Sequence, residues 1–355
     1  MDLPVRILLE APREPVLSVD GAFDAPGLNL SHWPGNRTPA SLRHDLSTGS
    51  ALAFARLPQE ERERLAAGAT AIVNNHFDTD GLCAAFAVRY PARALELEGP
   101  LLDAAACGDF FRYPSDEALA FDAIVTAFAD PDRSPLGASL RELPDAERYT
   151  RAQHALLERL PDLLGPPSEA GLAEYAPLWR DVVAAARADR ADLEAAERED
   201  VEALDLTLWT AEDGRGSSRP DSQGLFDPGR HALFGTSRAD RVLAVGPIAG
   251  GTSYRLIVST LSWFDLVTEQ RLPRPDLEAL ADDLNRLEDT RPSDDLAWRA
   301  QPRRNPSPEL WFGGREQASF AEHNPALAPS ELEPDTVLAA IEAALPSRGQ
   351  AHAND

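Results

Sequence analysis

The chain has 355 residues, of which 43% are hydrophobic, enough for two domains or for one large unit with two lobes. Its formal net charge of −25 at pH 7 argues against binding to duplex nucleic acid or to an anionic membrane, because both depend on a basic surface that neutralises phosphate. No apolar run is long enough to cross a membrane, and the N-terminus lacks the pattern of a signal peptide. We therefore expect a cytoplasmic protein.

All 34 basic residues are Arg, because the sequence contains no Lys. This excludes enzymes that use a Lys Schiff base and phosphate loops of the Walker type. The two cysteines, Cys83 and Cys107, are too few for a disulfide framework. The sequence has no G-x-S-x-G elbow and no G-x-G-x-x-G after a strand, which argues against a serine hydrolase and against a dinucleotide-binding dehydrogenase.

Short strands alternate with helices in the first part of the chain. We expect strands at 4–9, 15–20, 27–31 and from Ala71, and helices from Asp45, which would be the cap, and at 58–68, 80–89, 99–110 and 115–130. This alternation predicts an α/β fold at 1–140, a doubly wound and mostly parallel sheet with helices on both faces.

The rest of the chain has a different pattern. The residues at 141–200 predict a helical connector with helices at 151–164 and 172–200, and those at 201–345 predict a smaller α+β C-terminal lobe. In that lobe we expect strands at 201–209, 231–234, 241–245 and 254–264, a loop at 212–230, helices at 276–288 and 333–345, and irregular chain at 290–332. The tail at 346–355 is expected to be disordered.

The turn after the strand at Ala71 is the strongest chemical signal in the sequence. It holds His76, Asp78 and Asp80, each separated by one residue, with Gly81 behind them. An open α/β sheet binds ligands beyond the carboxyl ends of its strands, and carboxylates together with an imidazole suit a divalent metal. The alternative is a solvated acidic loop.

Three further candidates follow other predicted elements. Asp20 ends the second strand, His32 follows the third, and Asp109 lies at the end of the helix at 99–110. Mn²⁺ or Mg²⁺ fits these oxygen-rich ligands best, although the His residues leave Zn²⁺ as an option. Two such ions that share a bridging water would form a hydrolytic site for phosphoryl groups.

These segments resemble the motifs of the DHH phosphoesterase superfamily. His76-Phe-Asp78-Thr-Asp80-Gly81 looks like the first motif, and Asp20 is similar to the second. The segment Leu30–Asn36 resembles a degenerate third motif, Asp45–Thr48 resembles the segment that follows it, and Gly108–Phe110 resembles the fourth. The motif order is permuted, and the Gly-Gly-Gly-His signature of the usual second domain is absent. The whole chain also resembles an uncharacterised bacterial family that shares the His-Trp-Pro-Gly-Asn segment.

The resemblance implies a divalent-metal-dependent hydrolase of a small phosphoester or phosphoanhydride. The implied metal ligands are His76, Asp78, Asp80, Asp20 and Asp109. Asp78 would also act in catalysis, and His32 would be a ligand or the general acid for the leaving group. Arg37, through a bidentate pairing, and its neighbour Asn36 would bind the substrate phosphate, and Arg255 is a further candidate for such a pairing.

Two other interpretations remain open from the sequence. The first is a non-catalytic relative, a binding or regulatory protein that kept the fold and part of the site. The second is an α/β enzyme in which His32 and His76 perform acid–base chemistry without metal. The sequence does not indicate the oligomeric state.

Overall fold

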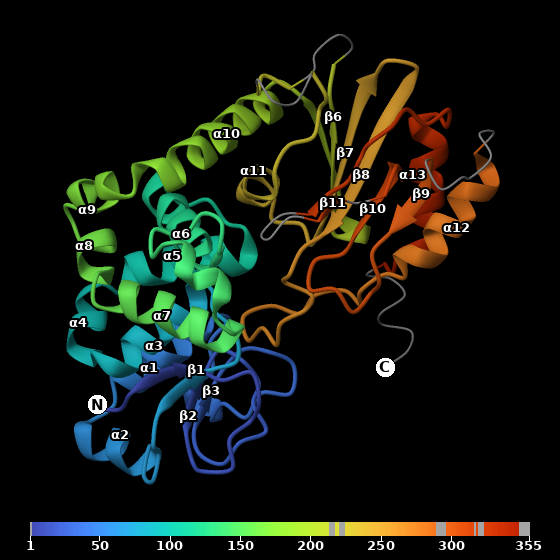
Figure 1. The fold of residues 1–355 in the computed structure, drawn as a ribbon. Helices are drawn as coiled ribbons and strands as arrows, with labels where there is room; N and C mark the ends of the chain where they lie inside the picture. Colours follow the sequence, from blue (N-terminus) through green and yellow to red (C-terminus); the bar gives the residue numbers. More distant parts are fainter. Residues whose placement is uncertain are drawn as a thin grey trace. The chain divides into compact units, whose positions relative to one another are not determined.

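The structure is a computed structural model that describes residues 2–212, 217–219, 224–288, 296–315, 317–318 and 323–347. The chain divides into two compact units: Met1–Val183 with Phe264–Gln270, and Ala184–Trp263 with Arg271–Asp355 (Figure 1). The tail predicted to be disordered lies outside the described residues from 348 onward. The loop predicted at 212–230 lies outside them at 213–216 and 220–223.

The first unit contains a parallel sheet of four short strands in the order β1-β4-β2-β3. These strands are β1 (Val5–Ile7), β2 (Leu17–Val19), β3 (Asn29–Leu30) and β4 (Ile72–Asn74). In the central strand β4, Ile72 lies between Val5 and Leu17. Because the four strands run in the same direction, the segments that leave their carboxyl ends all begin at one edge of the sheet.

Helices make up most of the rest of the first unit (Figure 1). They are α1 (Ser47–Ala55), α2 (Gln59–Leu65), α3 (Thr79–Arg89), α4 (Pro91–Glu96), α5 (Glu98–Phe110), α6 (Asp116–Ala129), α7 (Asp145–Leu157), α8 (Leu160–Leu164) and α9 (Glu169–Glu174), with the short 3₁₀ turns η1 (Ala40–Leu42) and η2 (Ala138–Glu142). Helix α10 (Ala176–Glu194) continues past the boundary at Val183.

Helix α3 is the central helix of this unit, because ten of its eleven residues are buried. Its small residues, among them Gly81, Ala84 and Ala85, leave room for α1 and α5 to pack closely against it. Asp78 is the N-cap of α3 and Asp80 lies in its first turn. The packing of α1 and α5 therefore brings elements distant in sequence to the acidic motif, His76–Gly81.

The second unit is built on a mixed sheet in the order β5-β6-β7-β8-β10-β9, in which only the pair β6–β7 is parallel among the described pairs. Its strands are β5 (Glu197–Val201), β6 (Leu206–Thr210), β7 (Arg241–Ile248), β8 (Gly251–Val258), β9 (Ala297–Ala300) and β10 (Glu309–Gly313). The remaining elements are η3 (Glu202–Leu204), α11 (Arg230–Thr236), α12 (Leu277–Leu287), β11 (Gln317–Ala318), β12 (His323–Asn324) and α13 (Pro334–Ala344).

The core of the second unit follows from the amphipathic pattern of α12. Leu277, Leu280 and Leu284 recur at spacings of three and four, and all three are buried in one cluster with residues of the sheet. Val337 and Ile341 of α13 join the same cluster. The mixed sheet is therefore covered by two C-terminal helices, α12 and α13 (Figure 1).

The predicted α/β class is confirmed, with a parallel sheet in the first half of the chain and a separate mixed sheet after it. The helices expected at 80–89, 99–110, 115–130, 276–288 and 333–345 correspond to α3, α5, α6, α12 and α13. The amphipathic pattern of α12 and end signals such as Pro91 after α3 made these helices predictable.

Several predicted elements are wrong in type or extent. The run at 231–234, expected as a strand, is part of the helix α11. Its three apolar residues, Ala232, Leu233 and Phe234, are too short a run to distinguish a strand from a helix. The helix expected at 172–200 ends at Glu194, and Glu197–Val201 instead pairs with β6 as an edge strand. The chain at 290–332, expected to be irregular, contributes the strands β9 and β10 with Trp298 and Trp311 buried in them.

Two further boundaries differ. The helix expected at 151–164 is two helices, α7 and α8, and Pro161 stands at the start of α8, where its missing N–H costs nothing. The strand expected at 254–264 ends at Val258, where the side chains of Ser259 and Asp240 hydrogen bond to each other at 2.6 Å. The segment Phe264–Gln270 lies outside the sheet and belongs to the first unit, and the chain returns to the second unit at Arg271.

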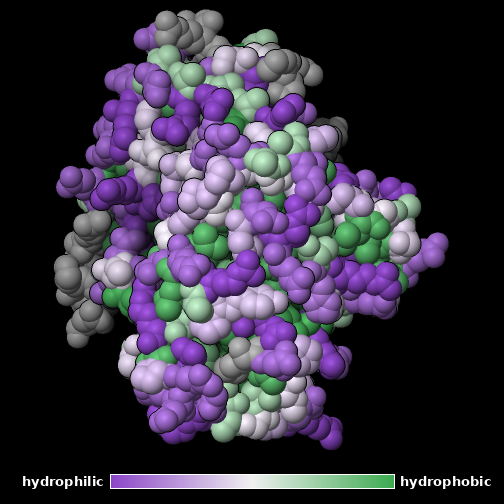
Figure 2. All heavy atoms as spheres, turned by 90° about the vertical axis from the view of Figure 1, so that its left-hand side faces the viewer, coloured by the Kyte–Doolittle hydropathy of each residue, from purple (hydrophilic) through white to green (hydrophobic). Residues whose placement is uncertain are grey.

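The surface is largely polar, as the acidic composition indicates. Figure 2 shows hydrophilic residues over much of one face of the molecule, with hydrophobic residues in small separate patches. Within the part of the chain that the structure describes, no helix combines the length and the apolar character needed to cross a membrane.

Candidate metal centre

Asp20 stands at the carboxyl end of β2 and is fully buried. Its backbone has a φ of 63°, a left-handed conformation that Asp tolerates better than most residues. The backbone N of the next residue, Gly21, donates a hydrogen bond of 3.0 Å to Asn74 Oδ1, and Asn74 Nδ2 donates one of 3.3 Å to Asp20 Oδ2. The ends of β2 and β4 thus fix the direction of the Asp20 carboxylate.

The first ligand group consists of Asp20, His76 and Asp78. His76 Nε2 lies 2.8 Å from Asp20 Oδ2 and 2.9 Å from Asp78 Oδ2. Asp78 is the N-cap of α3, since its Oδ1 accepts a hydrogen bond of 2.9 Å from Gly81 N. His76 Nδ1 lies 2.6 Å from Asn75 Oδ1, which accepts its proton, so that Nε2 is the nitrogen directed at the carboxylates.

The second ligand group consists of Asp20, His32, Asp80 and Asp109. His32 Nε2 lies 2.9 Å from Asp109 Oδ2, 3.6 Å from Asp80 Oδ2 and 3.7 Å from Asp20 Oδ1. This nitrogen is fully buried, and among the described residues none of these three contacts has the geometry of a hydrogen bond. His32 Nδ1–H donates to the backbone oxygen of Asp45, which again leaves Nε2 directed at the carboxylates.

The two groups share Asp20, which presents a different oxygen to each. Its Oδ2 lies against His76 and its Oδ1 against His32. Within each group the ligand atoms all lie within 4.8 Å of one another, a spacing at which one cation can contact all of them. The site could therefore hold two ions on either side of one carboxylate.

The start of α1 holds the Asp80 carboxylate in place. The backbone N of Ser47 donates to Asp80 Oδ2 at 2.8 Å, and that of Thr48 donates to Asp80 Oδ1 at 2.7 Å. A helix N-terminus offers such free amides to an anion. The Ser47 hydroxyl also donates a hydrogen bond of 2.9 Å to Asp20 Oδ1, so one turn of α1 orients two of the candidate ligands.

Gly81 allows α3 to approach the ends of β2 and β4. A Cβ atom at this position would lie 2.2 Å from Asn74 Nδ2 and 3.0 Å from Asp20 Oδ2. Contacts that short do not occur for real Cβ atoms, so a side chain here would displace Asn74 or the shared carboxylate. The Gly of the acidic motif is therefore explained by packing.

Electrostatics set the ligand protonation in the absence of metal. Burial, and then the charge of Asp20, raise the pKa of Asp80 to about 6. Burial, and then the charges of Asp80 and Asp78, raise the pKa of Asp109 well above its ordinary value. Crowded acidic groups of this kind favour either protons or a cation.

Around His76, the charges of neighbouring carboxylates outweigh the effect of burial on the pKa. Burial would lower its pKa, but the charges of Asp78 and Asp20 raise it well above the ordinary value for His. Burial would raise the pKa of Asp20, but the charge of His76 and its hydrogen bond hold that pKa below its usual range. Without metal, a proton shared with His76 therefore compensates part of the acidic charge.

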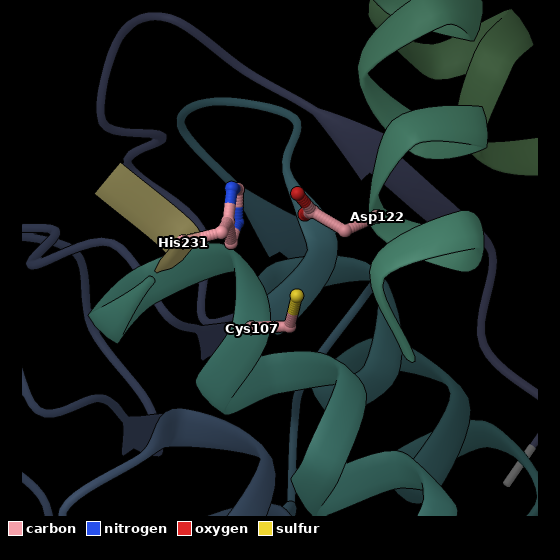
Figure 3. Close-up of side chains that lie close together, drawn as sticks. All are labelled: Cys107, Asp122 and His231. Atoms are coloured by element: carbon pink, nitrogen blue, oxygen red, sulfur yellow. The ribbon is translucent and has the colours of Figure 1, made fainter. Parts of the chain in front are cut away.

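Helices α5 and α6 pack against α3 and in this way support the site. Figure 3 labels Cys107 on α5 and Asp122 on α6, and Asp122 Oδ1 accepts a hydrogen bond of 2.5 Å from the hydroxyl of Thr79, the first residue of α3. Burial, and then the charge of Asp122, raise the pKa of Cys107 well above its ordinary value, so this thiol is protonated. His231, the third labelled residue, lies on α11 of the second unit.

The structure brings all the predicted metal ligands together with His32. They are Asp20, His76, Asp78, Asp80 and Asp109, in the two overlapping groups described above. The two predicted phosphate-binding residues make other contacts in the structure. Arg37 Nη2 donates to the backbone oxygens of Phe23 and Ala25, and Asn36 Nδ2 donates to Trp33 O and Asp265 Oδ2.

Two other expectations need correction. Asp45 does not cap α1, because the N-cap position is Leu46 and the Asp45 carboxylate accepts hydrogen bonds from Val267 and Thr268. Arg255, considered as a further phosphate ligand, is buried in the second unit in ion pairs of 2.7 Å with Glu309 and with Asp227.

Sequence reasoning missed residues that orient the ligands. Asn74 ends β4 and Asn75 follows it, and two amides at the end of a buried strand were a usable signal. Phe264 stacks on His32 with ring centroids 3.8 Å apart, and no local pattern pointed to it. Its contact depends entirely on how the distant segment Phe264–Gln270 packs.

The chain belongs to a protein family whose model is described as "Family of unknown function (DUF6687)" and matches residues 7–354. No curated protein sequence matches the chain.

Proposed function

We propose that this member of a family without an assigned function is a divalent-metal-dependent hydrolase of a small phosphoester or phosphoanhydride. The observation that carries the proposal is the pair of ligand groups joined by Asp20, whose two oxygens lie against His32 and His76. A carboxylate that faces two imidazole–carboxylate groups is the arrangement expected for a bridging ligand between two ions.

The need for a cation follows from the buried charge. Asp20, Asp80 and Asp109 are all buried, and burial of several carboxylates is unfavourable unless they are protonated, paired or bound to metal. The raised pKa values of Asp80 and Asp109 reflect the same cost of burying carboxylate charge. A divalent ion beside His32 Nε2 would satisfy that nitrogen and the surrounding carboxylates together.

The ligand types favour Mn²⁺ or Mg²⁺, with Zn²⁺ as an alternative. Each group offers one imidazole nitrogen and two or three carboxylates. Hard carboxylate oxygens suit Mg²⁺ and Mn²⁺, and the His ligands shift the balance from Mg²⁺ toward Mn²⁺. The other ring nitrogen of each His, Nδ1–H, donates a hydrogen bond to a fixed acceptor, as in almost all metal-binding His residues. The acceptor is Asn75 Oδ1 for His76 and Asp45 O for His32.

Substrate would reach the site from the side of the first group. The side chains of His76 and Asp78 are 26% and 35% exposed, whereas those of His32 and Asp20 are 0% exposed. His32 therefore fits the role of a ligand better than that of a general acid, which must reach the leaving group. Asp78, as an accessible carboxylate, is the better candidate for a residue that contacts substrate.

The two ions would supply the positive charge for the reaction. Metal ions in such a pair lower the pKa of a bound water and stabilise the oxygens of an in-line phosphoryl displacement. A small substrate is favoured because the net charge of −25 repels long polyanions. The resemblance of the acidic motif to the DHH phosphoesterases agrees with this chemistry. We also propose a cytoplasmic location, where buried cysteines outside disulfides, such as Cys83 and Cys107, are usual.

The experiment is a metal titration of the full chain followed by a turnover assay. Wild type, the double variant Asp78→Ala, Asp80→Ala and the control Asp132→Asn, a change at an exposed carboxylate, are titrated with Mn²⁺. We expect two ions per chain in wild type and in the control, and loss of binding in the double variant. Equal behaviour of all three proteins would refute the metal centre.

The turnover assay separates hydrolase from binding protein. Wild type loaded with Mn²⁺ is tested on a phosphomonoester, a phosphodiester and pyrophosphate. Cleavage of one of them that is lost with EDTA and in the double variant supports the hydrolase. Two bound ions without cleavage would favour the non-catalytic binding protein, and cleavage that resists EDTA would favour the metal-free enzyme.

A further inference from the structure

A short segment from the second half of the chain covers His32. Phe264–Gln270 packs with the first unit, although the chain on both sides of it belongs to the second unit. The Phe264 ring stacks on the His32 ring at a centroid distance of 3.8 Å and an angle of 13° between the planes. Asp265 N donates a hydrogen bond of 2.8 Å to His32 O. We call Phe264–Gln270 the strap.

Asp45 fastens the strap to the loop before α1. Its Oδ1 accepts hydrogen bonds from the backbone N of Val267 at 2.6 Å and of Thr268 at 3.0 Å, and its Oδ2 accepts from the Thr268 hydroxyl. The backbone oxygen of the same residue accepts the Nδ1 proton of His32. Asp45 therefore contacts His32 with its main chain and the strap with its side chain.

Other contacts keep the strap against the metal centre. Asn36 Nδ2 donates a hydrogen bond of 3.1 Å to Asp265 Oδ2. The Phe264 ring also lies 5.9 Å from Phe110, next to the ligand Asp109, and 6.2 Å from Trp33. These edge contacts between rings fix the plane of Phe264, and through the stacking contact they fix the plane of the imidazole.

We propose that the strap and Asp45 position His32 as a ligand of one metal ion only, the ion of the second group. Asp45 and Phe264 are positioning residues, and this role rests on the metal centre proposed above. An imidazole binds metal well only with the correct nitrogen deprotonated and the ring correctly turned, and partners that fix both features typically contribute 10- to 100-fold in affinity. Here the acceptor for Nδ1–H is Asp45 O and the support of the ring is Phe264.

The other ion provides an internal comparison. His76 is oriented by Asn75 Oδ1, at 2.6 Å from its Nδ1, and not by the strap. Loosening the strap should therefore affect the ion at His32 and spare the ion at His76. Removal of the Asn75 amide should do the reverse.

The test is a Mn²⁺ titration of the full chain that resolves the two binding events, read by calorimetry and by electron paramagnetic resonance of free Mn²⁺. Asp45→Ala and Phe264→Ala should each weaken one ion by about 10- to 100-fold and leave the other unchanged. Asn75→Ala should weaken the opposite ion. Phe264→Tyr keeps the stacking ring and should restore wild-type affinity, which a general loss of stability would not explain.

Hydrogen exchange gives a second measurement that needs no metal. The amides of Val267 and Thr268 should exchange faster in Asp45→Ala than in wild type, whereas the amides in the middle of α3 should not change. Equal weakening of both ions, or no weakening of either, would overturn the proposal. A wild-type chain that binds no Mn²⁺ would instead refute the metal centre, so the two failures are distinct.

Discussion

Asp20 Oδ2 lies 2.8 Å from His76 Nε2, although the two residues come from different strand ends of the parallel sheet. The other oxygen of the same carboxylate lies 3.7 Å from His32 Nε2. Asp20 is therefore the residue that links the two imidazole groups into one centre. This makes Asp20 the residue whose loss should affect both ions.

Asp20→Asn should abolish or weaken the binding of both metal ions, because a neutral amide cannot serve as a bridging carboxylate. Asp109→Asn should weaken only one ion, because Asp109 belongs to the second group alone. Metal stoichiometry after gel filtration, measured by elemental analysis, checks both. Retention of one ion at full affinity in Asp20→Asn would contradict the assignment of Asp20 as the shared ligand.

Metal affinity should fall as the pH is lowered through about 6. Burial raises the pKa of Asp80 to about 6, so below that pH a proton competes with the ion for this carboxylate. The raised pKa of His76 acts in the same direction, because its proton must leave before Nε2 can bind metal. Titrations with Mn²⁺ at pH 5, 6, 7 and 8 should show affinity increasing with pH, with protons released on binding.

Without metal the sign of the pH effect on stability is reversed. The raised pKa of Asp80 means that the folded chain binds its proton more tightly than the unfolded chain does. The contribution of Asp80 to stability is therefore greatest below pH 3.8 and is lost as the pH rises through about 6. In EDTA, the stability of wild type relative to Asp80→Asn should decrease between pH 4 and pH 7. An increase over that window would contradict the environment assigned to Asp80.

Gly81→Ala should disrupt the metal centre, because the added Cβ would lie 2.2 Å from Asn74 Nδ2. The matched control is Gly99→Ala in α5, where nothing lies within 4 Å of the added atom. The control should be neutral or should stabilise the chain by about 0.5–1 kcal/mol. Thermal unfolding and Mn²⁺ binding of the two variants compare the same chemical change with and without a clash. Normal Mn²⁺ binding by Gly81→Ala would show that the packing around Asn74 is looser than described.

Glu309→Gln should destabilise the second unit. Glu309 is buried, its Oε2 lies 2.7 Å from Arg255 Nε, and Arg230 pairs with its Oε1. Loss of one partner of a buried ion pair costs about 3–5 kcal/mol, whereas the exposed Glu342→Gln should change the free energy of unfolding by less than about 0.5 kcal/mol. Urea denaturation of both variants checks this difference.

The stability that the Glu309 ion pairs contribute changes with pH in the opposite direction to the contribution of Asp80. Burial would raise the pKa of Glu309, but the charges of Arg255 and Arg230 hold it below the ordinary value of 4.5. The stabilisation is present above pH 4.5 and is lost as the pH falls through the lower pKa of the folded state. The difference between wild type and Glu309→Gln should therefore shrink in acid. A constant difference between pH 7 and pH 3 would contradict the ion pair.

The candidate ligands were predictable from sequence because a parallel sheet collects its strand ends. His76, Asp78 and Asp80 follow a buried strand within six residues, and Asp20 and His32 each follow another strand of the same sheet. Once the α/β alternation is recognised, topology alone predicts that these ends meet at one edge. The pairing of Asp20 with both imidazoles required the structure.

The parts that were not predictable depend on tertiary contacts. Phe264 lies in a chain segment that read as the end of a strand, and nothing near it in sequence indicates a contact with His32. The sequence at Asp45 is typical of a helix cap, but the N-cap of α1 is Leu46 and the Asp45 carboxylate binds the strap instead. The charged residues Glu197–Val201 form a strand because β6 is available to pair with them, which local propensity does not reveal.

The most direct test of the central claim is the electron paramagnetic resonance spectrum of the full chain loaded with Mn²⁺. If Asp20 bridges two ions, the spectrum should show two magnetically coupled Mn²⁺ ions, and Asp20→Asn should abolish that coupling. A single uncoupled Mn²⁺ signal, identical in wild type and Asp20→Asn, would contradict the shared carboxylate and with it the proposed two-metal hydrolase.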